Sequence, residues 1–263
     1  MKKQILLIAS ILLLTGISSF AAGDNSVMYG FSAGYCRSMF SNTISSSTYN
    51  YDLLPVFQNA SGNGYFIGIT TRISLPFLSG TEIKSSFTGK LAYENHPAKG
   101  SVLGERYSYL VETSPGVYST ILESTIDYKL DLSYSTVNLG LIYSARLFNS
   151  NFSVDLGGSI GIAIQNRYVT SMNLITSPTL TLPEISLKGA DSIAKSLVIR
   201  FENNDRTGIL ADDKIPDVQN IRFGFIFGIR YDIKINKFIV SPNLIYNYGN
   251  KVSSLNFGVD LLF

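Results

Sequence analysis

Charged side chains recur at the polar positions of an alternating apolar and polar pattern along this chain. In each such stretch a large apolar residue stands at every second position, and the charged residues lie between them. Thirteen residues form this set: Arg72, Lys84, Lys90, Glu94, Asp127, Lys129, Asp131, Arg146, Asp155, Arg222, Arg230, Asp232 and Asp260. Because cations and anions nearly balance, the set favours ion pairs that fill an enclosed interior over a filter of a single sign for ions.

A base beside a nucleophile is the other chemistry to consider. The single histidine, His96, follows Glu94 by two residues and could act as a general base. It stands beside Pro97, just past the end of an alternating stretch, and we interpret it as an ordinary loop residue. Zinc sites need clusters of Cys and His, and Cys36 is the only cysteine. We therefore expect no catalytic, metal or cofactor site.

The first residues predict export. The segment "MKKQILLIASILLLTGISSFAAG" has two lysines, a short apolar run and then small residues. This order is typical of a secretory signal peptide cleaved between Ala21 and Ala22, and the run is too short to span a membrane. The expected division is a signal peptide, residues 1–21, and one mature domain, residues 22–263. Without Lys2 and Lys3, 19 Lys and Arg balance 19 Asp and Glu, which argues against a nucleic-acid partner.

Period-2 alternation predicts β-strands throughout the mature domain. Eight stretches carry it: 29–36, 65–73, 83–94, 126–147, 152–164, 221–232, 238–248 and 254–263. In the longest stretch, which contains "TIDYKLDLSY", the apolar positions slip by one at Ser135 and Thr136. We interpret the slip as a β-bulge in one long strand, with the apolar set on one face throughout; a turn there would raise the strand count.

The composition of the two faces indicates a membrane barrel rather than a soluble sandwich. The polar faces are rich in glycine, which weakens a solvated sheet but fits a narrow interior. The apolar faces carry tyrosines near their ends, as aromatic girdles do: Tyr35, Tyr65, Tyr93 and Tyr248 at one rim, Tyr143 and Tyr231 towards the other. The predicted fold is an all-β, antiparallel up-and-down transmembrane β-barrel with eight strands, ten being the alternative.

Connection lengths predict how this barrel is oriented. Those after the second, fourth and sixth strands are short, and the stretches 38–61, 96–123 and 166–217 read as long loops. Short periplasmic turns and long outward loops are typical of outer-membrane barrels. An eight-stranded interior is filled by side chains, so we expect a monomeric barrel without an open pore. Loops 96–123 and 166–217 could bind a cell-surface partner. A small porin or solute channel is the alternative, and a lipid-modifying barrel enzyme using His96 is a third.

The second half of the chain resembles a known family. The segment "LSYSTVNLGLIYSARLFNSNFSVDLGGSIGIAI", a long loop, and then "FGFIFGIRYDI", "IVSPNLIYNYG" and "LNFGVDLLF" together resemble the small outer-membrane β-barrel domain family typical of Bacteroidota. That family is similar to the OmpA and OmpX type of eight-stranded barrel, and includes porin-family outer-membrane proteins. The resemblance implies structural, adhesion or resistance roles in the cell outer membrane.

The last residues resemble a targeting signal. Asn256, Gly258, Leu261 and Phe263 follow the pattern of a polar residue, a glycine and two hydrophobic residues that closes on an aromatic. This pattern is similar to the C-terminal signal by which the barrel-assembly machinery recognises its clients. We expect the final strand to pair with the first, which removes the exposed sheet edge, and Phe263 to face lipid.

Overall fold

The computed structural model describes residues 27–45, 55–75, 84–114, 117–147, 150–175, 184–188, 196–200 and 207–263. The predicted signal peptide and its cleavage site at Ala21 and Ala22 lie outside these residues. The described residues form strands and their connections, and they contain no helix long and apolar enough to cross a membrane. The strands are β1 (Val27–Ser45), β2 (Val56–Leu75), β3 (Ser85–Ser114), β4 (Val117–Arg146), β5 (Phe152–Ile175), β6 (Glu184–Lys188), β7 (Ser196–Arg200), β8 (Thr207–Asp213), β9 (Ile221–Tyr231), β10 (Ile233–Ile235), β11 (Phe238–Gly249) and β12 (Val252–Leu262).

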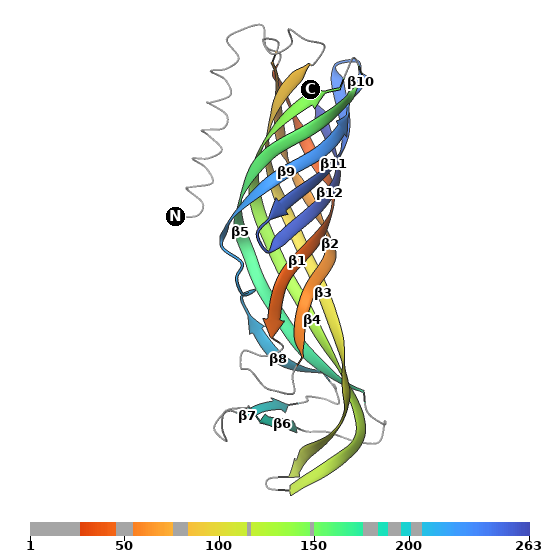
Figure 1. Ribbon diagram of the computed structural model, residues 1–263, viewed down its shortest axis with the longest axis vertical. Helices are drawn as coiled ribbons and strands as arrows, with labels where there is room; N and C mark the ends of the chain where they lie inside the picture. Colours follow the sequence, from red (N-terminus) through yellow and green to blue (C-terminus); the bar gives the residue numbers. More distant parts are fainter. Residues whose placement is uncertain are drawn as a thin grey trace.

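Eight of these strands close into a barrel (Figure 1). The ring runs β1, β12, β11, β9, β5, β4, β3, β2 and back to β1, and every pairing in it is antiparallel. The last strand pairs with the first over eleven residue pairs, from Gly30 opposite Leu262 to Phe40 opposite Val252. Phe263 and Tyr29 extend this pairing by exchanging two backbone hydrogen bonds. The predicted eight-stranded barrel is confirmed, because β6, β7, β8 and β10 lie outside the ring.

The strands are longer than the sequence pattern predicts. β3 and β4 have 30 residues each and pair from Ser85 opposite Ala145 to Ser114 opposite Val117. The predicted loop 96–123 is therefore almost entirely a β-hairpin, and β5, β6, β7 and β8 occupy much of the predicted loop 166–217. In Figure 1 the β3–β4 hairpin extends far below the rest of the barrel, while the C-terminus and the short β10–β11 link lie at the opposite end. We call the part of the barrel towards the β3–β4 hairpin the extension.

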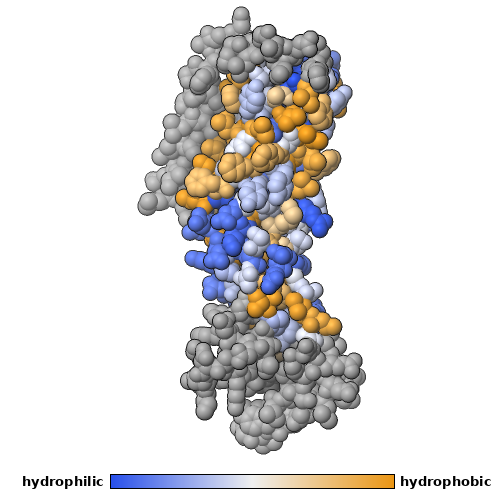
Figure 2. All heavy atoms as spheres, viewed as in Figure 1, coloured by the Kyte–Doolittle hydropathy of each residue, from blue (hydrophilic) through white to orange (hydrophobic). Residues whose placement is uncertain are grey.

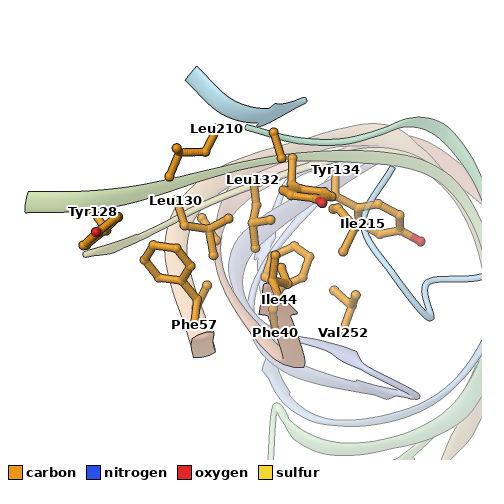
Figure 3. Close-up of a cluster of buried hydrophobic side chains, with 14 of the residues drawn as sticks. Phe40, Ile44, Phe57, Tyr128, Leu130, Leu132, Tyr134, Leu210, Ile215 and Val252 are labelled. Carbon is orange, nitrogen blue, oxygen red and sulfur yellow. The ribbon is translucent and has the colours of Figure 1, made fainter. Parts of the chain in front are cut away.

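A cluster of apolar side chains fills the barrel where the extension begins (Figure 3). Most of its buried members come from the inward face of β1, β2, β4 and β5, and Leu210, Ala211 and Ile215 cover it from β8 and the segment after it. We call this cluster the apolar plug: Phe40, Ile44, Phe57, Ala60, Ala98, Tyr128, Leu130, Leu132, Tyr134, Ala163, Tyr168, Met172, Leu210, Ala211, Ile215 and Val252.

Candidate functional site: a barrel wall of two zones around a filled interior

An apolar belt surrounds the barrel on the side away from the extension. Every strand of the ring contributes exposed large apolar side chains to it, and on the face that Figure 2 shows, orange hydrophobic residues gather over the upper half of the described surface. The belt comprises Tyr29, Phe31, Tyr35, Tyr65, Ile67, Ile69, Phe87, Leu141, Leu156, Ile160, Phe223, Phe225, Phe227, Ile229, Tyr231, Leu244, Tyr248, Leu255, Phe257, Val259, Leu261 and Phe263. A continuous apolar surface of this extent indicates contact with a membrane or a large apolar partner.

The height of the belt matches the apolar part of a bilayer. β9 has eleven residues, which span roughly 33 Å, or roughly 23 Å in height at a tilt of about 45°. Outer-membrane barrels carry an apolar band about 25 Å tall, bordered by aromatic side chains. Tyr35 and Tyr65 are opposite each other at the border with the extension, and the Tyr65 and Tyr93 rings are 6.1 Å apart. At the other border, the Phe87 and Tyr143 rings are 5.5 Å apart.

The two faces of the barrel wall exchange polarity where the belt meets the extension. On β4, Leu141 points outward in the belt, whereas Lys129 and Asp131 point outward in the extension. On the inward face the change is opposite: Ser144 and Asn138 lie inside the belt, and the apolar plug lies inside the extension. The extension is therefore built like a soluble protein, with an apolar core and a polar surface, while the belt has the reverse arrangement.

Neighbouring strands change polarity at the same height. On β1 the change lies between Tyr35 and Arg37, and on β3 it lies between Tyr93 and Asn95. Hydrogen bonds join polar groups of two strands there: the Tyr93 hydroxyl donates to Ser135 Oγ at 3.2 Å, and Ser135 Oγ donates to Asn95 Oδ1 at 3.1 Å. Gln165 of β5 is opposite Ser135 in the sheet. We call this height the reversal level.

The prediction of a bulge in β4 has to be corrected. β4 runs as one strand, as predicted, but it pairs with β3 without a shift at Ser135 and Thr136. The shift lies in its pairing with β5, where Ser135 is opposite Gln165 and Thr136 is opposite Ala163, so that β5 carries the extra residue. Even-numbered residues of β4 point inward on both sides of this point, and the polarity of the two faces changes instead of their phase.

Three of the predicted interior charges consequently lie on the outer surface. The prediction for Asp127, Lys129 and Asp131 was wrong, because the apolar residues between them form the plug. Lys129 lies 3.6 Å from Asp127, and Lys99 lies 3.6 Å from Asp131. A third exposed pair joins β5 to β8, where hydrogen bonds from Arg167 hold the pKa of the Asp212 carboxyl below its ordinary value.

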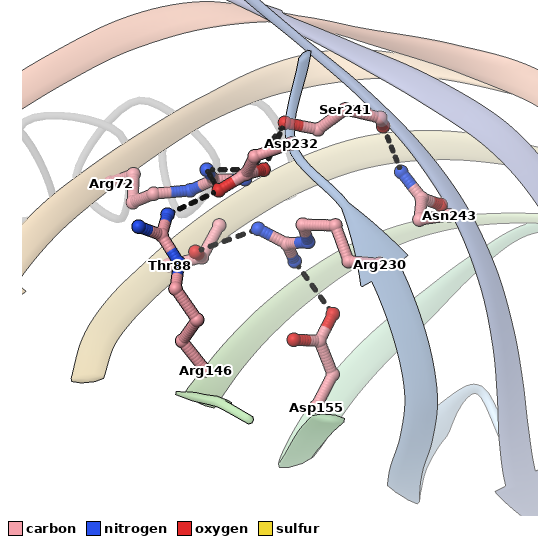
Figure 4. Close-up of polar contacts among 8 residues, drawn as sticks. All are labelled: Arg72, Thr88, Arg146, Asp155, Arg230, Asp232, Ser241 and Asn243. Carbon is pink, nitrogen blue, oxygen red and sulfur yellow. Dashed lines mark hydrogen bonds and ion pairs between the residues drawn. The ribbon is translucent and has the colours of Figure 1, made fainter. Parts of the chain in front are cut away.

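Nine of the predicted charges do line the interior, and two ion-paired groups organise five of them. In the first, shown in Figure 4, Asp232 accepts hydrogen bonds from Arg72 at 3.0 and 3.1 Å, from Arg146 at 2.9 Å and from Ser241 at 2.6 Å. In the second, Arg230 donates to Asp155 at 2.8 Å. Both side chains of the second pair are almost completely inaccessible to solvent, at 1% and 0% exposed.

The other interior charges occupy the middle of the belt and the reversal level. Lys90 lies 3.9 Å from Asp260 and sits over the Phe66 ring, with its Nζ 4.2 Å from the ring centre. Glu94 and Arg222 are buried near the reversal level. Lys84, the last of the thirteen, is exposed at the mouth of the barrel away from the extension.

His96 is the interior residue that the sequence interpretation missed. It lies on β3 rather than in a loop, points inward and is completely buried. Its Nε2 lies 3.1 Å from Glu94 Oε2, and its Nδ1 lies 2.8 Å from Ser38 Oγ. Ser, His and Glu in this order are the groups of a nucleophilic triad. The cavity beside Glu94, however, holds only about 30 Å³, roughly one water molecule. Lys90, Ala92, Glu94 and His96 stand at every second position and therefore lie on the same face of the strand. This spacing could have placed His96 in the interior.

Glycines on the inward face make room for large side chains. Phe66 lies across the barrel interior, and a Cβ added at Gly258 would overlap its ring. Gly258 and Asn256, two of the four residues of the predicted assembly signal, point inward and are buried, whereas Leu261 and Phe263 point outward into the belt. This arrangement gives Gly258 a packing role in the folded barrel.

Gly258→Ala should therefore destabilise the barrel by about 1–3 kcal/mol, because the added methyl group displaces the Phe66 ring. Urea titration of the folded protein in lipid vesicles measures the change. Gly158→Ala is the matched control, since its Cβ would meet only Gly224 O at 3.8 Å and should leave stability equal or slightly higher. Phe66→Leu should reduce the cost of Gly258→Ala, and an equal cost in both backgrounds would contradict the packing role.

Among the described residues, no group of three or more His, Cys, Asp or Glu side chains is arranged to hold a metal ion. The described interior combines ion pairs inside the belt with the apolar plug inside the extension. Such an interior can neutralise buried charge and block the barrel, and a cavity opens at the mouth near Lys84.

No protein-family model matches the sequence, and no curated protein is significantly similar to it. Among solved structures, the chain is similar to Neisserial surface protein A, with a TM-score of 0.33 and 12% identity over 91% of this chain and 98% of that chain. It is also similar to Ail, the attachment invasion locus protein of Yersinia pestis, with a TM-score of 0.28 and 10% identity over 90% and 99%. A third is the translocator domain of the autotransporter NalP from Neisseria meningitidis, with a TM-score of 0.26 and 9% identity over 100% and 97%. Because these scores and identities are low, the eight-stranded barrel is inferred from the strand pairing of this chain itself.

Proposed function

We propose that this chain is an outer-membrane β-barrel that is closed to diffusion and presents its extension at the cell surface. The observation that carries the proposal is the exchange of polarity along the strands, with an apolar belt of bilayer height on one side and a polar, apolar-filled extension on the other. A membrane segment and an aqueous segment of one barrel require opposite faces to be apolar. The signal peptide predicted at residues 1–21 would direct the export.

The proposed orientation places the extension outside the cell and the short turns in the periplasm. Long outward segments and short periplasmic turns are the rule in outer-membrane barrels. The β3–β4 hairpin, β8 and the end of β5 then form the surface available to a partner, and Lys99 forms an exposed ion pair with Asp131 on this surface. We propose a structural or surface-interaction role for this monomeric barrel through segments 96–123 and 166–217.

Labelling of single cysteines in intact cells tests this topology. Lys129→Cys on the outer surface of the extension should react with a membrane-impermeant maleimide, because its side chain is half exposed. Leu141→Cys in the belt should stay unlabelled in intact cells, and Lys234→Cys near the opposite mouth should react only after the outer membrane is disrupted. The native Cys36 is buried and gives little background. Labelling of Lys234→Cys in intact cells would contradict the orientation.

The filled interior supports a closed barrel. The ion pair of Arg72 with Asp232 joins opposite sides of the ring across the interior, and the plug fills the barrel on the extension side of it. Eight-stranded barrels are just wide enough for side chains to fill. Purified protein in planar bilayers should therefore show no stable large conductance. Liposomes that contain the protein should not swell in small sugars. A steady conductance in the wild-type protein would support the channel alternative instead.

We further propose that the role is not catalytic and needs no cofactor, since His96 is enclosed and the adjoining cavity has no room for a substrate. Leu261 and Phe263 lie on the belt face of the strand that closes the ring, where the barrel-assembly machinery could recognise them. The resemblance of the second half of the chain to the small outer-membrane β-barrel domain family remains a prediction.

A further inference from the structure

A cavity of about 450 Å³ opens at the mouth of the barrel on the side away from the extension. Pockets for small molecules usually have volumes of about 300–1,000 Å³. Its walls come from β1, β2, β3, β4, β5, β9 and β11 and from the segments next to them, so it is enclosed by the ring itself. Five serines are among the lining residues, Ser74, Ser85, Ser86, Ser144 and Ser153. We call this cavity the vestibule.

The vestibule has a surplus of positive charge. Among the described residues, its lining includes the cations Arg72, Lys84, Arg146, Arg230 and Lys234, and a single acidic side chain, Asp232. Arg72 and Arg146 share that one carboxylate, while Arg230 is paired with Asp155. Five cations against these two carboxylates leave an excess of three positive charges. Lys84 and Lys234 are both exposed at the opening and belong to neither ion-paired group.

Buried donors in the vestibule lack acceptors among the described residues. Arg72 Nε and Arg230 Nε have no hydrogen-bond partner there, and neither do the hydroxyls of Ser85 and Ser144. All four residues line the vestibule and are more than nine-tenths buried. Unsatisfied buried donors cost free energy, so a group that accepts several hydrogen bonds would be bound favourably at this place.

We propose that the vestibule binds a soluble, multiply charged oxyanion, a phosphate or a phosphate ester, from the periplasmic side. A phosphoryl group supplies several acceptor oxygens and two negative charges, which suit guanidinium donors and hydroxyls. A phospholipid could supply the same headgroup chemistry. Arg72, Ser144, Arg146 and Arg230, however, lie on the inward faces of their strands, while the lipid-facing belt lies on the outward faces of the ring.

Calorimetric titration of the full folded chain in a phosphate-free detergent tests the proposal, with inorganic phosphate and pyrophosphate as probes. We expect saturable binding to one site, with a Kd of about 1 mM or lower. The double variant Lys84→Gln/Lys234→Gln should weaken binding about fivefold, because two exposed charges at the opening are removed. Ser144→Ala should weaken it about threefold without lowering stability, since no protein hydrogen bond is lost.

The matched control is Lys99→Gln/Lys129→Gln, which removes two exposed lysines from the outer surface of the extension and should bind phosphate like the wild type. Equal weakening in both double variants would show general charge attraction and overturn the proposal. Absence of saturable phosphate binding would overturn it as well. Binding of short-chain phosphatidic acid without binding of inorganic phosphate would identify a lipid headgroup as the ligand and overturn the soluble source.

Discussion

Asp155→Ala is expected to destabilise the folded barrel by about 3–5 kcal/mol, the largest effect of any single substitution considered for this chain. The Asp155 carboxylate accepts a hydrogen bond from Arg230 at 2.8 Å, and the Arg230 side chain is 1% exposed. Removal of the carboxylate leaves a guanidinium enclosed by the barrel wall, where Thr88 is its other hydrogen-bond partner, at 3.4 Å. Urea unfolding of the protein in lipid vesicles, followed by the mobility shift between folded and unfolded barrel, measures the loss.

Two further variants test whether the loss of stability comes from burial of the ion pair or from the loss of a charge alone. Asp131→Ala removes a carboxylate of an exposed ion pair on the extension and should change stability by less than about 1 kcal/mol. Asp155→Ala combined with Arg230→Met should recover most of the loss, because the uncompensated buried charge is gone. If the double variant is as unstable as Asp155→Ala, the buried cation is not the cause of the destabilisation.

Ile69→Lys should destabilise the barrel by about 2–4 kcal/mol in lipid vesicles. Ile69 is exposed near the middle of the apolar belt on β2, with Ile67 and Thr71 on the same face. If the belt faces hydrocarbon, a lysine there carries its charge into a medium without water. The same unfolding titration measures the change in free energy.

Asn63→Lys provides a control on the same face of the same strand. Asn63 points outward beyond Tyr65, on the extension side of the reversal level, and the substitution should change stability by about 0.5 kcal/mol or less. Similar effects of the two lysines would contradict the assignment of the belt to the bilayer and of the extension to water.

The ring of eight strands could be predicted because alternation is a local signal. Each strand of the belt has large apolar residues at every second position, as in Phe223, Phe225 and Phe227, and the pattern persists whichever strand lies beside it. The closure of the ring by β12 and β1 was also predicted correctly. The sequence could predict that interior charges form ion pairs, but it could not predict individual pairs between distant strands, such as Arg72 with Asp232. Alternation shows on which face of the sheet a side chain lies, but it does not show which side chain it contacts.

The extension could not be predicted, because an alternating pattern does not state which face is inside. In β4 the apolar positions are even-numbered up to Tyr134 and odd-numbered from Val137, and a bulge and an exchange of environment produce the same pattern. The assumption that apolar residues always face lipid selected the bulge. Asp127, Lys129 and Asp131 were misplaced for this reason, and His96 was assigned to a loop because the strand was expected to end before it. In the structure, the even-numbered residues of the described part of β4 face inward throughout, while the apolar residues change from the inward to the outward face. Such a change of face without a bulge in the strand indicates a barrel that leaves the membrane.

Spin labels placed one at a time along the outward face of β4 measure where the barrel wall passes from the membrane into water. In a Cys36→Ala background in lipid vesicles, cysteine-linked nitroxides at Lys129, Asp131, Ser133, Val137, Leu139 and Leu141 report collisions with oxygen and with a water-soluble nickel complex. We expect nickel to dominate at the first three positions and oxygen at the last three, with the crossover at Ser135, at the reversal level. Equal nickel accessibility along the whole series, or oxygen dominance at Lys129 and Asp131, would contradict this expectation.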